Sequence, residues 1–160
     1  MSYFKNEILN QEYLVTTHSS KQTTSLNANT YTTIAGSEIS FTPHVDSTYV
    51  IYEIGFYAQV INYQSFQHIR FQYLVSGGNW TEFDANLGKN FGPSASGDYY
   101  RNFMYLKYIV PTWTGQRQLR VQSAPHTDNR QTEFHQLTDW DGAGSVTNRF
   151  CNTNLIVYSI

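Results

Sequence analysis

The sequence predicts an all-β fold, a β-sandwich of the jelly-roll kind. Aromatic residues make up 16% of the 160 residues and charged residues only 14%, against about 25% charged residues in ordinary soluble domains. The uncharged hydrogen-bonding residues number 17 Thr, 14 Ser, 13 Asn and 11 Gln, a composition that favours strands and turns over helices. Apolar residues recur with a period of two in segments separated by Gly-marked turns, as in strands with one buried face.

The first 30 residues are the least core-like part of the chain, and we expect a lead or linker segment there. The run KQTTSLNANT is polar and has no apolar periodicity. Before it, several apolar positions fit one face of a short helix, and a connection to a stalk fits equally well: Phe4, Ile8, Leu9, Tyr13 and Leu14. A single β-sandwich domain is expected over residues 31–160, long enough for a core without disulfides.

Strand signals begin at residue 31. In SEISFTP, Ile39 and Phe41 alternate with polar residues, and Pro43 suits a strand end because it lacks an N–H. HIRFQYLV predicts a strand, and SGGN is expected to turn it into a hairpin that returns over residues 80–83. The segment YVIYEIGFYAQV, between SEISFTP and HIRFQYLV, predicts a long strand. Every second residue is apolar and is expected to form its core face: Val50, Tyr52, Ile54, Phe56, Ala58 and Val60.

The second half of the chain is expected to alternate strands with two long loops. Residues 84–98, rich in Gly, Ser and Pro, form the first loop, and YYRNFMYLKYIV and RQLRVQSA follow as strands. Residues 125–148 form the second loop, in which EFHQLT is a further strand candidate and DWDGAGS a turn. NLIVYSI is expected to be the last strand.

Two of these strands are apolar on both faces. One face carries Phe103, Tyr105, Ile109, Ile156, Tyr158 and Ile160, and the opposite face carries Met104, Leu106, Tyr108, Val110, Leu155 and Val157. A two-sheet sandwich buries only one face of each strand, so the other face needs a further cover. A symmetric partner subunit is favoured as that cover, in a homo-oligomer. The alternative cover is the loops or the N-terminal segment.

Composition also excludes several classes of partner. A net charge of −2 gives no electrostatic footprint for nucleic acid, and no Lys/Arg run or long apolar stretch predicts membrane contact or insertion. The first residues lack the apolar segment of a signal peptide. Cys151 is the single cysteine, so no intrachain disulfide forms, and we expect a buried, inert thiol.

Several motifs occur in the order of a known class of viral domain. These are TYTTIAGSEISFTP followed by STYVIYEIGFYAQV, the GG-x-W hairpin at Gly77, Gly78 and Trp80, the turn WTGQRQLR that begins at Trp113, and the final VYSI. On these motifs, residues 30–160 resemble the C-terminal, receptor-binding domain of phage and marine-virus tail fibre or virion surface proteins. The resemblance implies a trimeric jelly roll of the tumour-necrosis-factor or C1q kind at the distal end of a fibre.

The resemblance also implies a function, which is host attachment through a cell-surface glycan or protein receptor. Low charge without an export signal or disulfide agrees with a virion protein that is assembled in the host cytoplasm and extracellular after release. No coiled coil or collagen-like repeat precedes the domain, which leaves open a fragment of a longer fibre or a short virion protein. Two other functions also stay open: a carbohydrate-binding module or glycan-active enzyme on a β-sandwich, and a purely structural virion protein.

Binding is expected in the two long loops, because loops of this length in a small domain are usually functional or disordered. An aromatic ring in such a loop supplies contact area while neighbouring polar groups fix orientation. The candidate ligand contacts on this basis are Trp140, Asp139, Asp141, Arg130 and Phe91. Trp140 is the leading candidate, and the alternative is that its ring caps the end of the sandwich.

No catalytic residue, metal site or cofactor is expected. Glycan hydrolysis needs two carboxylates at a set separation, and nothing in the sequence pairs Glu53, Glu82, Asp84 or Asp98. TDWDGAGS lacks the further ligands of a calcium loop, and no zinc spacing is found among His126, Asp128, His135 and Asp139.

Glu53 is the most notable carboxylate, because it stands in mid-strand between apolar neighbours and opposite the core face. A cross-strand partner, Arg70 or Lys107, is favoured for it. A place in an interface or a role as a catalytic acid is the alternative.

Overall fold

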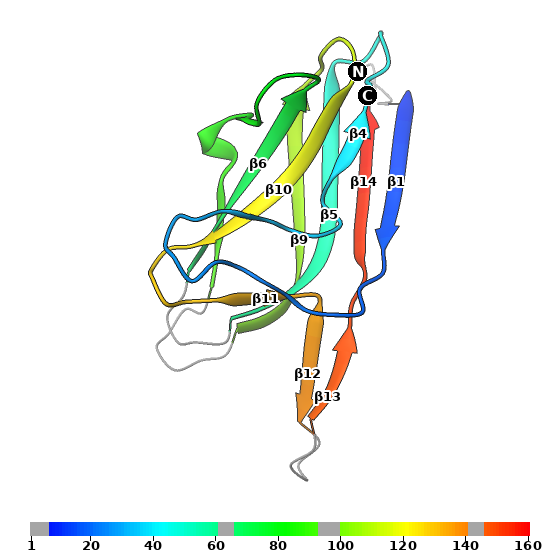
Figure 1. The fold of residues 1–160 in the computed structure, drawn as a ribbon. Helices are drawn as coiled ribbons and strands as arrows, with labels where there is room; N and C mark the ends of the chain where they lie inside the picture. Colours follow the sequence, from blue (N-terminus) through cyan, green and yellow to red (C-terminus); the bar gives the residue numbers. More distant parts are fainter. Residues whose placement is uncertain (1–6, 61–65, 93–99, 141–145) are drawn as a thin grey trace, which may run out of the picture.

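Two antiparallel sheets packed face to face make up the fold (Figure 1). The computed structural model describes residues 7–60, 66–92, 100–140 and 146–160. Within these ranges the single helical turn is the 3-10 helix η1, Ala85–Leu87, and no helix is long and apolar enough to span a membrane. The prediction of an all-β, sandwich-like fold is therefore confirmed.

The first sheet, here the β5 sheet, is built around the longest predicted strand. Its strands are β1 (Asn10–Thr16), β2 (Gln22–Thr23), β5 (Tyr49–Val60), β9 (Tyr100–Pro111), β11 (Thr132–Phe134) and β14 (Thr153–Ser159). β9 pairs with β5 along its whole length on one edge, while β14 and β11 share the other edge of β5. β1 extends the sheet beyond β14, and β2 extends it beyond β11.

The second sheet, here the β10 sheet, covers one face of the first. Its strands are β3 (Thr32–Thr33), β4 (Ile39–Phe41), β6 (Gln67–Val75), β7 (Thr81–Glu82), β8 (Lys89–Phe91) and β10 (Arg117–Pro125). β10 and β6 form its centre; β3 and β4 border β10, and β7 and β8 border β6. The SGGN turn makes the expected hairpin between β6 and β7, with Gly77 in the left-handed region at φ 76°.

An aromatic cluster joins the two sheets. Phe71 of β6 lies between Tyr52 of β5 and Tyr108 of β9, with ring centroids 4.7 and 4.5 Å away. The Tyr52 hydroxyl, although fully buried, donates a hydrogen bond of 2.6 Å to the Ser37 carbonyl, so burial leaves that polar group satisfied. Of the expected core face of β5, all residues whose side chains are described are fully buried: Val50, Tyr52, Ile54, Phe56 and Ala58.

The N-terminal segment does not form the helix that was one expectation for it. Asn10–Thr16 is strand β1, paired in register with β14 through Tyr13–Ile156 and Leu14–Leu155. Without β1, the outer edge of β14 would leave its backbone N–H and C=O groups without strand partners, and pairing with β1 satisfies them. Leu14 then packs against the core while Tyr13 and Val15 stand on the exposed side.

The two expected long loops contain regular structure. Residues 84–92 include η1 and β8, and residues 125–148 include β11 and most of a separate two-stranded ribbon, β12 (Gln136–Trp140) and β13 (Val146–Phe150). The ribbon leaves the sandwich at the lower end in Figure 1. The strand candidate EFHQLT divides between β11 and β12. Glu133 is buried in β11, where Lys21 and Gln59 bind its carboxylate.

Candidate functional site

The side of the β5 sheet that faces away from the β10 sheet is apolar, and no other strand among the described residues covers it. We call it the β5 outer face; it consists of Tyr13, Val15, Ile51, Glu53, Phe103, Tyr105, Lys107, Ile109, Ile156 and Tyr158. Tyr13 is 64% exposed, Tyr105 59% and Ile109 53%. The residues of β9 and β14 in this set belong to the additional apolar faces that the sequence analysis found on those strands. Two residues of β1, Tyr13 and Val15, extend the same surface. Contiguous exposed apolar patches of this kind mark interaction sites.

Glu53 lies at the centre of the β5 outer face with three donors around its carboxylate. Lys107 Nζ lies 2.9 Å from Oε1, the Tyr158 hydroxyl donates to Oε1 at 2.8 Å, and the Tyr105 hydroxyl donates to Oε2. Burial by itself would raise the pKa of Glu53, but these hydrogen bonds and the Lys107 charge outweigh it and lower that pKa below 4.5. The predicted partnership with Lys107 is confirmed.

A shallow hollow of about 240 Å³ lies beside Glu53. Gly55 forms part of its floor, and a Cβ at that position would come within 2.7 Å of the Phe103 ring. The absence of a side chain at Gly55 therefore lets Phe103 lie across β5. The hollow is mostly apolar, with Tyr13, Tyr105 and Ile156 on its walls.

The outer face of the β10 sheet is polar. On it, Arg70 donates through Nε and Nη2 to Gln122 Oε1 at 2.9 and 2.6 Å, and Arg120 donates through Nε to Gln72 Oε1 at 3.0 Å. Both guanidinium groups also stack on aromatic rings. Tyr31 lies 3.8 Å from the Arg70 guanidinium carbon, and Trp80 lies 3.7 Å from that of Arg120. We call this layer of side chains, together with Leu74 and Gln118, the β10 outer face.

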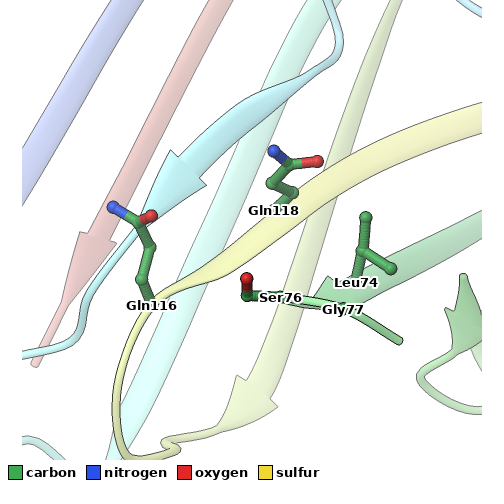
Figure 2. Close-up of a pocket in the computed structure, with 5 residues that line it drawn as sticks. All are labelled: Leu74, Ser76, Gly77, Gln116 and Gln118. Atoms are coloured by element: carbon green, nitrogen blue, oxygen red, sulfur yellow. The ribbon is translucent and has the colours of Figure 1, made fainter. Parts of the chain in front are cut away.

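A hollow of about 230 Å³ opens on the β10 outer face, where β6 ends and β10 begins (Figure 2). Leu74 of β6 and Gln118 of β10 are paired in register and project to the same side in Figure 2. Gln116 comes from the turn before β10, and Ser76 and Gly77 come from the hairpin turn after β6. A second hollow of about 150 Å³ shares Gln118 and lies toward β4, lined by Glu38, Ile39 and Ser40.

A pair of stacked histidines lies where β11 passes into the ribbon. The rings of His18 and His135 are parallel within 7°, with centroids 3.7 Å apart, and both contact the Thr153 hydroxyl. His135 is fully buried, and its Nε2 has no hydrogen-bond partner in the described chain. Burial, followed by the charge of His18, lowers the pKa of His135 to about 3. Both histidines are therefore neutral near pH 7.

Two of the five predicted ligand contacts lie at the distal end of the ribbon. Asp139 and Trp140 are the last residues of β12, opposite Thr147 and Val146 of β13. Asp141 and the expected turn after it lie outside the described residues. The ribbon therefore carries Trp140 to its end that is farther from the sandwich (Figure 1).

The other two predicted contacts lie away from Trp140. Phe91 belongs to β8 and is 7% exposed within the core cluster, so its ring fills the sandwich and does not stand on a loop surface. Arg130 is half-buried just before β11. Of the further candidates, Cys151 is half-buried as well, and burial raises the pKa of its thiol.

The described residues contain no group of three His, Cys, Asp or Glu side chains that could hold a metal ion. His126 contacts His68, with 2.9 Å between Nδ1 and Nε2, and Asn90 takes the other side of the His68 ring. Among the candidate acids, Glu53 and Glu82 belong to different sheets. Asp84 caps η1 through its side chain, and Asp98 lies outside the described residues.

The sequence did not single out Arg120 or Gln118, and it offered Arg70 only as a partner for Glu53, whereas Arg70 lies in the other sheet and binds Gln122. Each sits at an outward position of a predicted strand, where a polar residue is unremarkable by itself. Only the register of β6 against β10 shows that these side chains meet their partners across the two strands. The alternation of Arg with Gln in both strands was the available signal.

Comparison with known proteins gives distant structural likenesses and no family. No family model matches the sequence, and no curated protein matches it. Among solved structures, the enzymatically active domain of bacteriophage CBA120 tailspike protein 4 is similar at 14% sequence identity and a TM-score of 0.32. The match covers 79% of this chain but only 19% of that one. A TM-score of this size does not assign a common fold.

Proposed function

We propose that the chain is a non-catalytic virion surface module that assembles as a homotrimeric jelly roll and attaches the particle to its host. The observation that carries this proposal is the β5 outer face. It gathers exposed apolar and tyrosine side chains of β1 and β9, with half-buried Ile156 and Tyr158 of β14 between them, on the side of the sheet that the second sheet does not cover. A surface of this composition is stabilised when a partner removes it from water.

The electrostatics of this face suit another copy of the same chain. Lys107 and Glu53 neutralise one another within one subunit, so two such faces meet without repulsion between like charges. The carboxylate already accepts hydrogen bonds from two tyrosines, which lowers the cost of covering it. A homo-oligomer with closed symmetry uses such a surface without a further protein. The number three comes from the resemblance to trimeric fibre-tip domains.

The ribbon supports the attachment part of the proposal. It extends from one end of the sandwich, and Asp139 and Trp140 end its first strand. A tryptophan beside a carboxylate at the end of such an extension is suited to contact a host glycan or protein receptor. Glu53 lies in a different sheet from Glu82, and its carboxylate is saturated by its own donors, which favours binding over hydrolysis.

Attachment is tested by binding of the fluorescently labelled protein to a panel of candidate host cells, measured by flow cytometry. Trp140→Ala is expected to abolish binding while leaving the melting temperature and the assembled mass unchanged. Val45→Ala is the matched control, because Val45 is 89% exposed in the turn between β4 and β5, at the end of the sandwich opposite the ribbon. Unchanged binding by Trp140→Ala would remove the ribbon from the attachment site.

A further inference from the structure

We propose that the β10 outer face carries a binding site for a neutral sugar, at the hollow formed by Leu74, Ser76, Gln116 and Gln118. This site lies on the sheet opposite the proposed assembly face and apart from the ribbon that the proposed attachment uses. Its ligand is a hexose or N-acetylhexosamine residue of a glycan.

The lining of the hollow has the chemistry that a sugar ring requires. Gln116 and Gln118 each offer an amide that both donates and accepts, and Ser76 offers a hydroxyl that does the same. Sugar hydroxyls also donate and accept, so one ring edge can satisfy several of these groups at once. Leu74 supplies an apolar patch to one side of them for the C–H groups of the ring. Sites of this composition fix a ligand through few polar groups on an apolar surface.

An aromatic ring stands next to this hollow in a fixed orientation. β6 and β7 pair through Gln72–Glu82 and Tyr73–Thr81. Continuing this register by one residue places Trp80 beside Leu74. One face of the Trp80 indole lies on the Arg120 guanidinium, 3.7 Å away, and the Arg120 side chain is only 15% exposed beneath it. Trp80 is half-buried, and we infer that the face of its indole turned away from Arg120 contacts a ligand that extends from the hollow past Leu74.

The support under this site is rigid. Arg120 is held by Gln72 at 3.0 Å, and Gln72 itself is buried. On the core side of the same strand, Arg117 stacks on Tyr73 and Trp113, at 4.4 and 4.9 Å, and holds the start of β10 in place. Side chains that are already fixed lose little conformational entropy when a ligand binds, so even a small ligand gains affinity from them.

The charges around the hollow favour a neutral ligand over an acidic one. The hollow of about 230 Å³ is lined by uncharged side chains, and Glu38, 59% exposed at its side chain, lines the neighbouring hollow that shares Gln118. The Arg120 guanidinium is engaged by Gln72 and Trp80 and lies 3.9 Å from Glu38. A carboxylated sugar would therefore meet an exposed carboxylate and no uncommitted cation. The small volume, below the roughly 300–1,000 Å³ of drug-sized pockets, fits one sugar residue.

Saturation-transfer difference NMR on the full chain tests the site. The probes are the methyl glycosides of glucose, galactose, mannose and N-acetylglucosamine, with glucuronic acid and N-acetylneuraminic acid as acidic counterparts. We expect transfer to at least one neutral glycoside and none to the acids. Gln118→Ala and Trp80→Ala should each weaken the binding by about tenfold or more, equivalent to about 1.4 kcal/mol. Asn86→Ala, an exposed amide on η1, is the matched control and should bind as the parent does.

Two results would overturn the site: no transfer to any neutral glycoside, or transfer that persists in both Gln118→Ala and Trp80→Ala. Transfer to the acids alone would also contradict it. If Trp80→Ala unfolds by circular dichroism, Gln118→Ala decides, because Gln118 is exposed and its loss leaves the core intact. A parent chain that binds a neutral glycoside but none of the host cells would contradict the ribbon-borne attachment and leave this site standing.

Discussion

Glu53 and Lys107 face each other across β5 and β9 and form an ion pair, with 2.9 Å between Oε1 and Nζ. The pair lies in the middle of an otherwise apolar sheet face, and Tyr105 and Tyr158 complete the hydrogen bonds of the carboxylate. An unpaired carboxylate would oppose the covering of this face, because burying an unpaired charge is costly. The ion pair therefore lowers the free-energy cost of burying the β5 outer face in an oligomer.

The first prediction concerns this ion pair. Glu53→Gln leaves Lys107 without its carboxylate and weakens the bonds from both tyrosines, so the free energy of unfolding should fall by about 1 kcal/mol. Urea denaturation measures the change. Glu12→Gln on β1, an exposed carboxylate outside the cluster, should leave the midpoint unchanged. Equal midpoints for the two variants would show that the Glu53 cluster contributes nothing to stability.

The second prediction concerns the assembly face. Ile109→Asp places a carboxylate on the β5 outer face, where it would be buried without a partner in an oligomer. Because Ile109 is half exposed in the single chain, the variant should keep its fold and lose its assembly. Analytical ultracentrifugation should show a monomer with the parent's circular dichroism spectrum. Val45→Asp, which adds the same charge away from this face, should assemble normally, and an oligomeric Ile109→Asp would exclude this face as the interface.

The third prediction concerns pH. His135 has a folded-state pKa of about 3, below its ordinary value of 6.5, so the unfolded chain binds more protons between these values. Its contribution to stability is complete above pH 6.5 and is lost as the pH falls, by about 1.4 kcal/mol per pH unit within that window. His18, stacked on the ring, adds to the effect because burial lowers its pKa as well. Urea denaturation should give a lower free energy of unfolding at pH 5 than at pH 7.

A control separates His135 from other groups that titrate. His135 has a φ of 68°, which asparagine adopts more readily than most residues, so His135→Asn should keep the backbone and remove the titration. The stability of His135→Asn should change less between pH 7 and pH 5 than that of the parent. A parent protein equally stable at both values would contradict the assigned burial of the imidazole.

The fourth prediction concerns the last strand. Leu155 and Val157 are fully buried, and β14 joins β1 to β5. Removing residues 155–160 exposes both neighbouring strands and takes away side chains worth about 1.5–3 kcal/mol each, a large part of the usual margin of about 5–15 kcal/mol. The truncated chain should be insoluble or unfolded by circular dichroism. A soluble, folded product would show that β14 is dispensable.

The strands with strict alternation were predictable, because a period of two is a local property. β5, β9 and β14 follow from their own residues, whereas the sequence left both Arg70 and Lys107 open as partners of Glu53, and the register of β5 against β9 selects Lys107. β1 was not predictable in the same way. Its seven residues contain one partly buried apolar side chain, Leu14, and its strand conformation depends on the edge that β14 offers.

Contacts between distant segments were also beyond local reasoning. Nothing near His18 in the chain indicates that its ring stacks on His135, and nothing near Glu133 indicates that Lys21 binds it. Phe91 looked like a loop residue because Gly and Ser surround it, but β8 pairs with β6 and turns the ring into the core. In each case the register between strands, and not the local composition, decides where the side chain lies.

The mass of the protein in solution tests the central claim of assembly through the β5 outer face most directly. Multi-angle light scattering at micromolar concentration should give three times the chain mass of 18.5 kDa. The same mass should be found across dilutions within that range, because covering the apolar face stabilises the oligomer relative to the separate chains. A species of 18.5 kDa at these concentrations would contradict the claim and leave the exposed tyrosines and isoleucines of this face without a partner of the same chain.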